Sequence, residues 1–259
     1  MRAFFSFLYG LAAYAASLAA LLYLMGFTAN WRVPTSVDVG TAAPWGQAVV
    51  IDLLLLALFG LQHSVMARRS FKRWWTQWVG PTVERSTFIL ATSLVLALLY
   101  WQWRPIAAPT VWRVEQPVAA GGLVVLFWLG WALALISTFL INHFELFGLQ
   151  QVFARLTGRA MPAQQFKTPL LYRHVRHPLY LGLLLAFWST PVMSAGHLLF
   201  SAGASLYILI GIAFEERDLL AQFGERYRRY RAEVGMLIPR SRPPLRKAGA
   251  DARPKENRF

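Results

Sequence analysis

Cysteine is absent from the 259-residue sequence, and charged residues are scarce. Without cysteine there are no disulfides, no thiolate nucleophile, no cysteine-ligated zinc and no iron–sulfur cluster. Charged residues make up 15% of the chain, against roughly 25% in a typical soluble domain. Acidic residues are the rarest, with 12 Asp and Glu against 26 Lys and Arg. A soluble enzyme is therefore a poor interpretation of this chain.

Hydrophobic residues, in contrast, make up 56% of the sequence, and aromatic residues make up 15%. A chain of this length cannot bury so much apolar surface in one soluble core, so we expect an all-α integral membrane protein. Spanning the bilayer takes about 20 apolar residues in a helix. Six segments approach that length, at 3–29, 45–66, 86–101, 118–141, 178–195 and 197–214.

The basic residues are confined to alternate connections. Four cations and no acid follow the second segment, at Arg68, Arg69, Lys72 and Arg73, and more lie between 142 and 177 and after 214. The alternating connections at 30–44 and 102–117 contain only one and two basic residues. This pattern predicts cytoplasmic N- and C-termini. It also accounts for the basic excess, so we expect no nucleic-acid partner.

The last two segments are short, and only Ser194 to Gly196 separate them. We expect a tight helical hairpin, so the protein has either six crossings or five crossings with a re-entrant pair. Residues 215–235 carry an apolar stripe at helical spacing, which predicts a cytoplasmic amphipathic helix with a bend at Gly224. The expected regions are a four-helix membrane part (1–141), a cofactor-binding part (142–240) and a disordered basic tail (241–259).

The densest polar cluster flanks the hairpin. Pro178 suits the first turn of a helix, so His174, Arg176 and His177 lie where a helix N-terminus favours an anion. Glu215 and Glu216 leave the hairpin on the same side and favour a cation. Tyrosines that can stack on a ligand lie nearby, at Tyr180, Tyr227 and Tyr230. The cluster therefore predicts a site for a zwitterionic ligand such as S-adenosylmethionine, although ATP or an anionic lipid has matching chemistry.

Simpler interpretations of the same residues remain open at this stage. Arginine and histidine at a cytoplasmic boundary can serve only as topology anchors. His174 and His177 have a spacing that can bind a metal. No third ligand lies at a telling distance from this pair, so we expect no metal site.

Two further polar groups end predicted membrane segments on the cytoplasmic side. One is His63, between Gln62 and Ser64, and the other is His143 with Glu145. These side chains either line one cavity with the hairpin or are polar helix ends. Asp52 lies near the outer end of its segment, far from the cluster, and we expect a structural partner for it.

These residues carry a family resemblance. Arg176-His177-Pro178-Leu179-Tyr180-Leu181-Gly182, then Glu215-Glu216, then FGERYRRY at 223–230 resemble the isoprenylcysteine carboxyl methyltransferase superfamily of membrane enzymes, over roughly 171–240. A longer likeness, including INHFELFGLQQVF and nearly the whole chain, is to the bacterial methanethiol S-methyltransferase family. NnrU-type membrane proteins are a weaker match.

The resemblance implies a function and a location. It implies methylation of methanethiol to dimethyl sulfide with S-adenosylmethionine, in the bacterial inner membrane, with the cofactor bound by His174, Arg176, His177, Pro178, Tyr180, Glu215, Glu216, Tyr227 and Tyr230. The partners are then a small volatile thiol and the lipid bilayer, with no obligate protein partner inferred.

Methylation of a thiol requires that the thiol lose its proton. The nucleophile is a thiolate, so a base or a positive site is expected near it, and the catalytic candidates are His63, His143 and Glu145. A methyltransferase for a larger lipophilic acceptor, such as an isoprenoid carboxylate, and a non-enzymatic NnrU-type protein remain alternatives.

Overall fold

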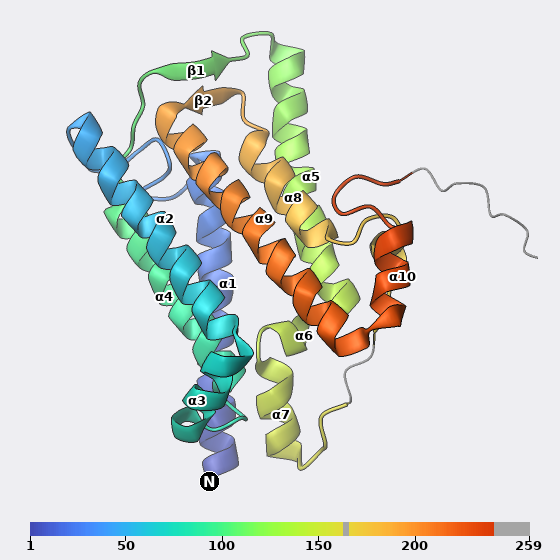
Figure 1. The fold of residues 1–259 in the computed structure, drawn as a ribbon. Helices are drawn as coiled ribbons and strands as arrows, with labels where there is room; N and C mark the ends of the chain where they lie inside the picture. Colours follow the sequence, from blue (N-terminus) through green and yellow to red (C-terminus); the bar gives the residue numbers. More distant parts are fainter. Residues whose placement is uncertain (163–165, 241–259) are drawn as a thin grey trace, which may run out of the picture.

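The computed structural model describes residues 1–162 and 166–240, so the predicted basic tail at 241–259 lies outside the described residues. The chain forms a bundle of long helices with shorter helices gathered at one end (Figure 1). The elements, in order, are α1 (Arg2–Ala29), α2 (Trp45–Ala67), α3 (Arg69–Val79), α4 (Glu84–Gln102), β1 (Thr110–Arg113), α5 (Pro117–Ile141), α6 (His143–Leu146), α7 (Leu149–Thr157), η1 (Leu170–Arg173), α8 (Pro178–Trp188), β2 (Val192–Ser194), α9 (Ala195–Phe223) and α10 (Glu225–Glu233).

Four helices, α1, α2, α5 and α9, are long and apolar enough to cross a membrane. The pair α3 and α4 adds a fifth crossing if it counts as one bent span, with an angle of 105° between the two helices. The fifth predicted segment is represented by α8, which has only 11 residues. At 1.5 Å per residue a helix of this length covers about half of the hydrocarbon layer. The protein is thus an integral membrane protein with four or five full-length spans.

Two connections pair at the end of the bundle opposite the N-terminus (Figure 1). There β1 and β2 form an antiparallel pair, with Arg113 opposite Val192 and Thr110 opposite Ser194. The sequence analysis did not anticipate these strands, because three or four residues are too few to show an alternating pattern. The pair ties the α4–α5 connection to the α8–α9 connection.

The hairpin formed by α8 and α9 is longer at its turn than predicted. Because α8 ends at Trp188 and β2 follows, the turn runs over 189–194 rather than over Ser194 to Gly196. The carbonyl of Phe187, which the end of α8 leaves free, lies 3.1 Å from the Nε2 of His197 and accepts a hydrogen bond from Ser201 (2.7 Å). These contacts satisfy a backbone group that water cannot reach.

The helix predicted at 215–235, with a bend at Gly224, is divided between two helices in the structure. Residues up to Phe223 continue α9, and α10 begins only at Glu225. The break lies at Gly224, where a bend was expected, because its φ of +53° with ψ of −128° is a conformation that only glycine adopts readily. The apolar stripe in the sequence therefore continues across a sharp change of direction.

Aromatic side chains fill the centre of the bundle. Phe27, Tyr100, Trp103 and Phe200 form successive ring contacts with centroids 5.3–5.9 Å apart. Asp52 is completely buried beside this core, and its Oδ1 accepts a hydrogen bond from the backbone amide of Arg104 (2.9 Å). The expectation of a structural partner for Asp52 is confirmed.

Close backbone contact joins α5 to α8. A Cβ atom on Gly182 would lie 2.5 Å from the carbonyl oxygen of Gly130 and 2.6 Å from the amide of Ala134. A Cβ atom on Gly130 would lie 2.6 Å from the amide of Ala186. Each helix thus presents a small residue four positions before another, which is how membrane helices approach closely.

We expect Gly182→Ala to lower the free energy of unfolding by about 1–3 kcal/mol, because the added methyl group meets backbone that cannot move aside. Gly122→Ala on α5 is the matched control, since nothing lies within 4 Å of its Cβ position. Unfolding in mixed detergent micelles measures both variants. Equal stability of Gly182→Ala and Gly122→Ala would show that α5 and α8 accommodate the added methyl group without loss of free energy of unfolding.

Candidate functional site

Three segments meet at the start of α8. The backbone amide of Arg176 donates to the carbonyl of Gly235 (2.8 Å), and the amide of His177 donates to the carbonyl of Met236 (3.1 Å). These bonds bring the segment after α10 alongside the residues that precede α8. Pro178 is at the first turn of α8, as predicted, where its missing N–H leaves no hydrogen bond unmade.

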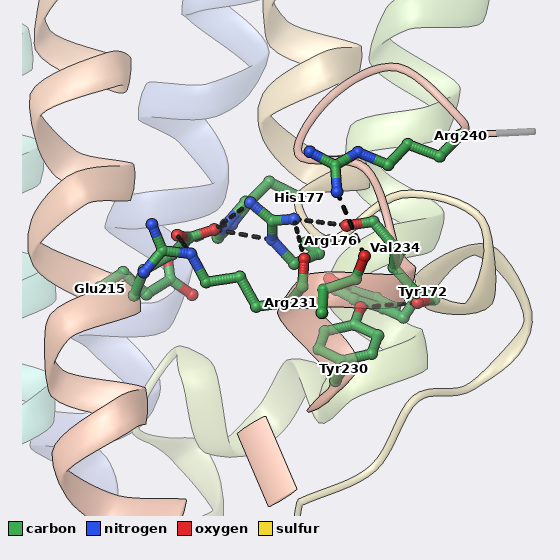
Figure 2. A network of polar contacts seen from close by, with 10 residues as sticks. Tyr172, Arg176, His177, Glu215, Tyr230, Arg231, Val234 and Arg240 are labelled. Carbon is green, nitrogen blue, oxygen red and sulfur yellow. Dashed lines mark hydrogen bonds and ion pairs between the residues drawn. The ribbon is translucent and has the colours of Figure 1, made fainter. Parts of the chain in front are cut away.

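The carboxylate of Glu216 is the centre of this site, and Figure 2 shows its partners Arg176, His177 and Arg231. Its Oε1 accepts from Nε of Arg176 (2.7 Å) and lies 3.2 Å from Nε2 of His177. Its Oε2 lies 3.1 Å from Nε of Arg231 on α10. Because Glu216, Arg176 and His177 are all buried, this network binds α8, α9 and α10 together with charges that water screens little.

The guanidinium of Arg176 is fully engaged by the protein. Besides Glu216, it donates to the carbonyls of Arg231 (3.1 Å) and Val234. The sequence analysis paired Arg176 with a ligand carboxylate and Glu216 with a ligand cation. The structure instead pairs the two with each other, so their contacts hold the walls of the site in place.

Glu215 and Tyr180 lie beside this network, next to His177. The side chain of Glu215 is 43% exposed, and its Oε2 is 3.8 Å from Nδ1 of His177. The ring of Tyr180 lies 5.7 Å from the ring of His177. The Tyr180 hydroxyl hydrogen-bonds to the Glu215 carboxylate, and Glu215 is the member of this pair that is exposed for contact with a ligand.

An aromatic group borders the network on the α10 side. Phe166 contacts the rings of Phe223, Tyr227 and Tyr230, with centroids 5.3–5.8 Å apart. Tyr230 donates its hydroxyl to the carbonyl of Tyr172 (2.6 Å), and burial raises its pKa to about 12. The Tyr227 hydroxyl is buried and has no hydrogen-bond partner among the described residues. Sequence reasoning missed Phe166, which no motif marks.

A pocket of about 810 Å³ opens between the 166–169 segment and α10. Its lining combines aromatic rings with charges of both signs and consists of Phe166, Lys167, Thr168, Pro169, Arg173, Glu225, Arg226, Arg229, Tyr230 and Glu233. The pocket has room for a ligand of nucleoside size and lies directly against the aromatic group.

His174 is separated from the other predicted cofactor residues. It is exposed and lines a different, almost wholly apolar hollow of about 540 Å³ against α5, with Leu133, Ile136 and Leu171 among its neighbours. Position 174 precedes the turn into α8, so its side chain points away from Arg176 although the two are close in sequence.

His143 is fixed at the junction of α5 and α6. Its Nε2 is 2.9 Å from the hydroxyl of Tyr14, and its Nδ1 is 2.8 Å from that of Thr138. Burial lowers its pKa below the usual value of 6.5. Glu145 accepts a hydrogen bond from the Asn142 side chain (2.8 Å), which also caps α6.

His63 lies on α2 between aromatic rings. It stacks on Phe59 (5.6 Å) and contacts Tyr207 of α9 (6.1 Å), and its Nδ1 is 3.2 Å from the hydroxyl of Thr92. Its ring also lies 4.7 Å from Phe88. No hydrogen-bond partner of Nε2 occurs within the described parts of the chain.

The two histidines face one apolar cluster from different helices. The cluster contains Phe88, Ile89 and Phe147, and His143 lies 4.7 Å from Phe147. Arg85, which the sequence analysis did not select, donates to the carbonyl of Leu146 (2.6 Å) and covers the ring of Phe88. The structure therefore brings α2, α4 and α6 together here through packed rings.

Comparison with known proteins gives a consistent group of relatives. The chain is 54% identical to "Methanethiol S-methyltransferase" of Mycobacterium tuberculosis (92% of this chain, 98% of the relative) and 55% identical to "Methanethiol S-methyltransferase 1" of Bradyrhizobium diazoefficiens (91% and 82%). It is 32% identical to mouse "Nurim" over 65% of this chain and 66% of that protein. No family model matches the chain, and no solved structure matches it.

We expect Glu216→Gln to lower the free energy of unfolding by about 3 kcal/mol, because the change leaves buried cations without a counter-charge. Glu225→Gln is the matched control. Its partner Arg228 and Glu225 itself are both about two-thirds exposed, and an exposed pair contributes about 0–1 kcal/mol. Detergent unfolding and limited proteolysis after α9 report the result. A stable, protease-resistant Glu216→Gln protein contradicts the structural role.

Proposed function

The chain belongs to the methanethiol S-methyltransferase family, and on this basis we propose that it methylates methanethiol to dimethyl sulfide with S-adenosylmethionine as the methyl donor. The observation that carries the proposal is identity above 50% over about nine-tenths of the chain to relatives of that name. The polar network and pocket at one end of an apolar bundle support it, because a charged cofactor and a small lipophilic thiol need different surroundings.

Residues of the polar network, the aromatic group and the pocket lining fit this cofactor. Glu215 has an exposed carboxylate for an ammonium or a ribose hydroxyl, and Phe166 and Tyr230 offer ring faces for an adenine. The unpaired hydroxyl of Tyr227 is a buried group that a polar ligand would satisfy. Arg176, His177, Pro178 and Glu216 act in this proposal as the frame that positions these contacts.

The role of the chain in catalysis is mainly placement. The cofactor supplies an electrophilic methyl group. The bond that forms joins the substrate sulfur to the methyl carbon, and the bond that breaks leaves its electron pair on the donor sulfur. The protein must align the two sulfur atoms, exclude water and accept the thiol proton. The apolar interior of the bundle suits a small thiol that enters from lipid.

Among the three base candidates, the contacts favour His63. Both ring nitrogens of His143 have partners in the protein, and Glu145 is occupied by Asn142. His63 uses only Nδ1 and can take a proton on Nε2. Arg85, with its guanidinium over the shared apolar cluster, provides a positive charge that favours the thiolate.

We place the site on the cytoplasmic side of the bacterial inner membrane, together with both termini. The N-terminus, α3, α7 and α10 lie at one end of the bundle (Figure 1), and α3, α7 and α10 contain eight basic residues of the kind that mark cytoplasmic connections. S-adenosylmethionine is charged and polar, so it reaches a site on the cytoplasmic side directly from the cytosol.

The direct test uses purified protein in detergent with S-adenosylmethionine, with and without methanethiol, and follows dimethyl sulfide by gas chromatography. We expect thiol-dependent product. Cofactor binding without product would move the substrate to a larger lipophilic acceptor. A well-folded protein that neither binds the cofactor nor forms product would favour a non-enzymatic role.

Tyr227→Phe tests the cofactor contact separately from folding. The variant removes a buried hydroxyl that has no partner in the described protein, so stability should stay unchanged, whereas the Kd for S-adenosylmethionine should rise about 5- to 10-fold for one lost hydrogen bond. Tyr230→Phe is the comparison, because it loses a bond to the carbonyl of Tyr172 and should melt earlier. Unchanged cofactor affinity in Tyr227→Phe would remove this hydroxyl from the site.

The pH dependence of kcat/KM distinguishes the histidines. We expect His63→Gln to abolish the rise of the rate with pH, and His143→Gln to leave the profile in place. Burial lowers the pKa of His143, so the unfolded chain binds a proton more readily than the native chain. Native stability therefore falls as pH drops below about 6.5, and His143→Gln should remove that dependence. A profile unchanged by His63→Gln would exclude it as the base.

A further inference from the structure

The helix α3 has no part in the proposed methyl-transfer site. It follows α2 directly and meets α4 at 105°, so it lies across the end of the bundle where the N-terminus and α7 are found (Figure 1). The sequence analysis treated this stretch only as a basic connection. The structure shows an 11-residue helix with two contrasting faces.

One face of α3 is aromatic. Phe71, Trp74, Trp75 and Trp78 recur at the three- and four-residue spacing of a helix face, and neighbouring rings lie 5.4–5.9 Å apart. Trp74 is 53% exposed and Trp78 is 76% exposed. Large amphipathic rings exposed at the end of a membrane bundle are typical of the bilayer–water interface.

The other face of α3 is cationic. Lys72 is paired with Glu84 at the start of α4 (3.8 Å), which fixes the helix against the bundle. Arg69 and Arg73 are exposed, and neither has an ion-pair partner among the described residues. Between 68 and 83 the sequence contains no acidic residue, so this surface attracts anions.

We propose that α3 is an interfacial anchor that selects anionic phospholipid headgroups. The tryptophans enter the boundary between headgroups and acyl chains, and Arg69 and Arg73 contact the lipid phosphates above it. A helix with this division of faces lies in the plane of the interface. The attraction amounts to about 1 kcal/mol per basic residue near an anionic surface, or about fivefold in local lipid concentration.

The absence of cysteine in the chain allows a single reporter in the full-length protein. Gln77→Cys, an exposed position on α3, is labelled with a fluorophore and reconstituted in phosphatidylcholine nanodiscs. The discs contain a small, equal fraction of nitroxide-labelled phosphatidylglycerol or nitroxide-labelled phosphatidylcholine. Quenching reports which lipid lies beside α3.

We expect at least about twofold stronger quenching by the anionic lipid, and loss of this preference when salt rises from about 50 mM to about 500 mM. Arg69→Gln with Arg73→Gln should abolish the preference while the protein stays folded. Arg155→Gln on α7 with Arg159→Gln just after it, which removes the same charge from exposed positions at the same end of the bundle, should keep it.

Equal quenching by the two lipids in the parent protein would overturn the selectivity, and so would a preference that survives high salt. Absence of quenching by either lipid would show that the aromatic face does not lie in the bilayer. The salt titration needs no variant, so the proposal stays testable even if the arginine double variant fails to fold.

Discussion

The pairing of the buried Glu216 carboxylate with Arg176, His177 and Arg231 is the interaction on which the arrangement of α8, α9 and α10 depends. Three side chains from two segments meet it, Arg176 and His177 just before α8 and Arg231 on α10, and both of these helices are short. The helix α10 has nine residues, and α8 has eleven. Helices of this length are marginal alone, so their positions come from tertiary contacts. The helix α10, which lines the pocket, keeps its position because Arg231 is paired with the buried Glu216.

This arrangement divides the family motif into two kinds of residue. Arg176, His177 and Glu216 contact each other and the backbone, whereas Glu215 and the hydroxyl of Tyr227 lack such saturation. The sequence motif does not distinguish residues that hold the structure together from residues that contact a ligand, because both kinds are charged or aromatic. The difference lies in how many partners each side chain already has.

The hydrophobic segments, the break at Gly224 and the gathering of polar residues at the ends of the hairpin could be predicted from spacing and composition, whereas the direct pairing of Arg176 with Glu216 could not. The short strands, the turn of α8 and α9 and the helix α3 could not, because their patterns extend over too few residues or depend on partners distant in sequence. His174 and Phe166 show the same limit at the site. His174 was predicted from its neighbours and points elsewhere, while Phe166 joins the tyrosines from an unmarked segment.

The shortness of α8 has a mechanical consequence. A membrane helix that matches the bilayer adjusts its tilt when the thickness of the hydrocarbon layer changes. Because α8 covers about half of that layer and the buried carbonyl of Phe187 near its end contacts His197 and Ser201, α8 makes no contact with the headgroups on the second side of the bilayer. Its depth is set by close packing on α5. Changes in bilayer thickness therefore reach α8 through the tilt of α5 and not through headgroup contacts of its own.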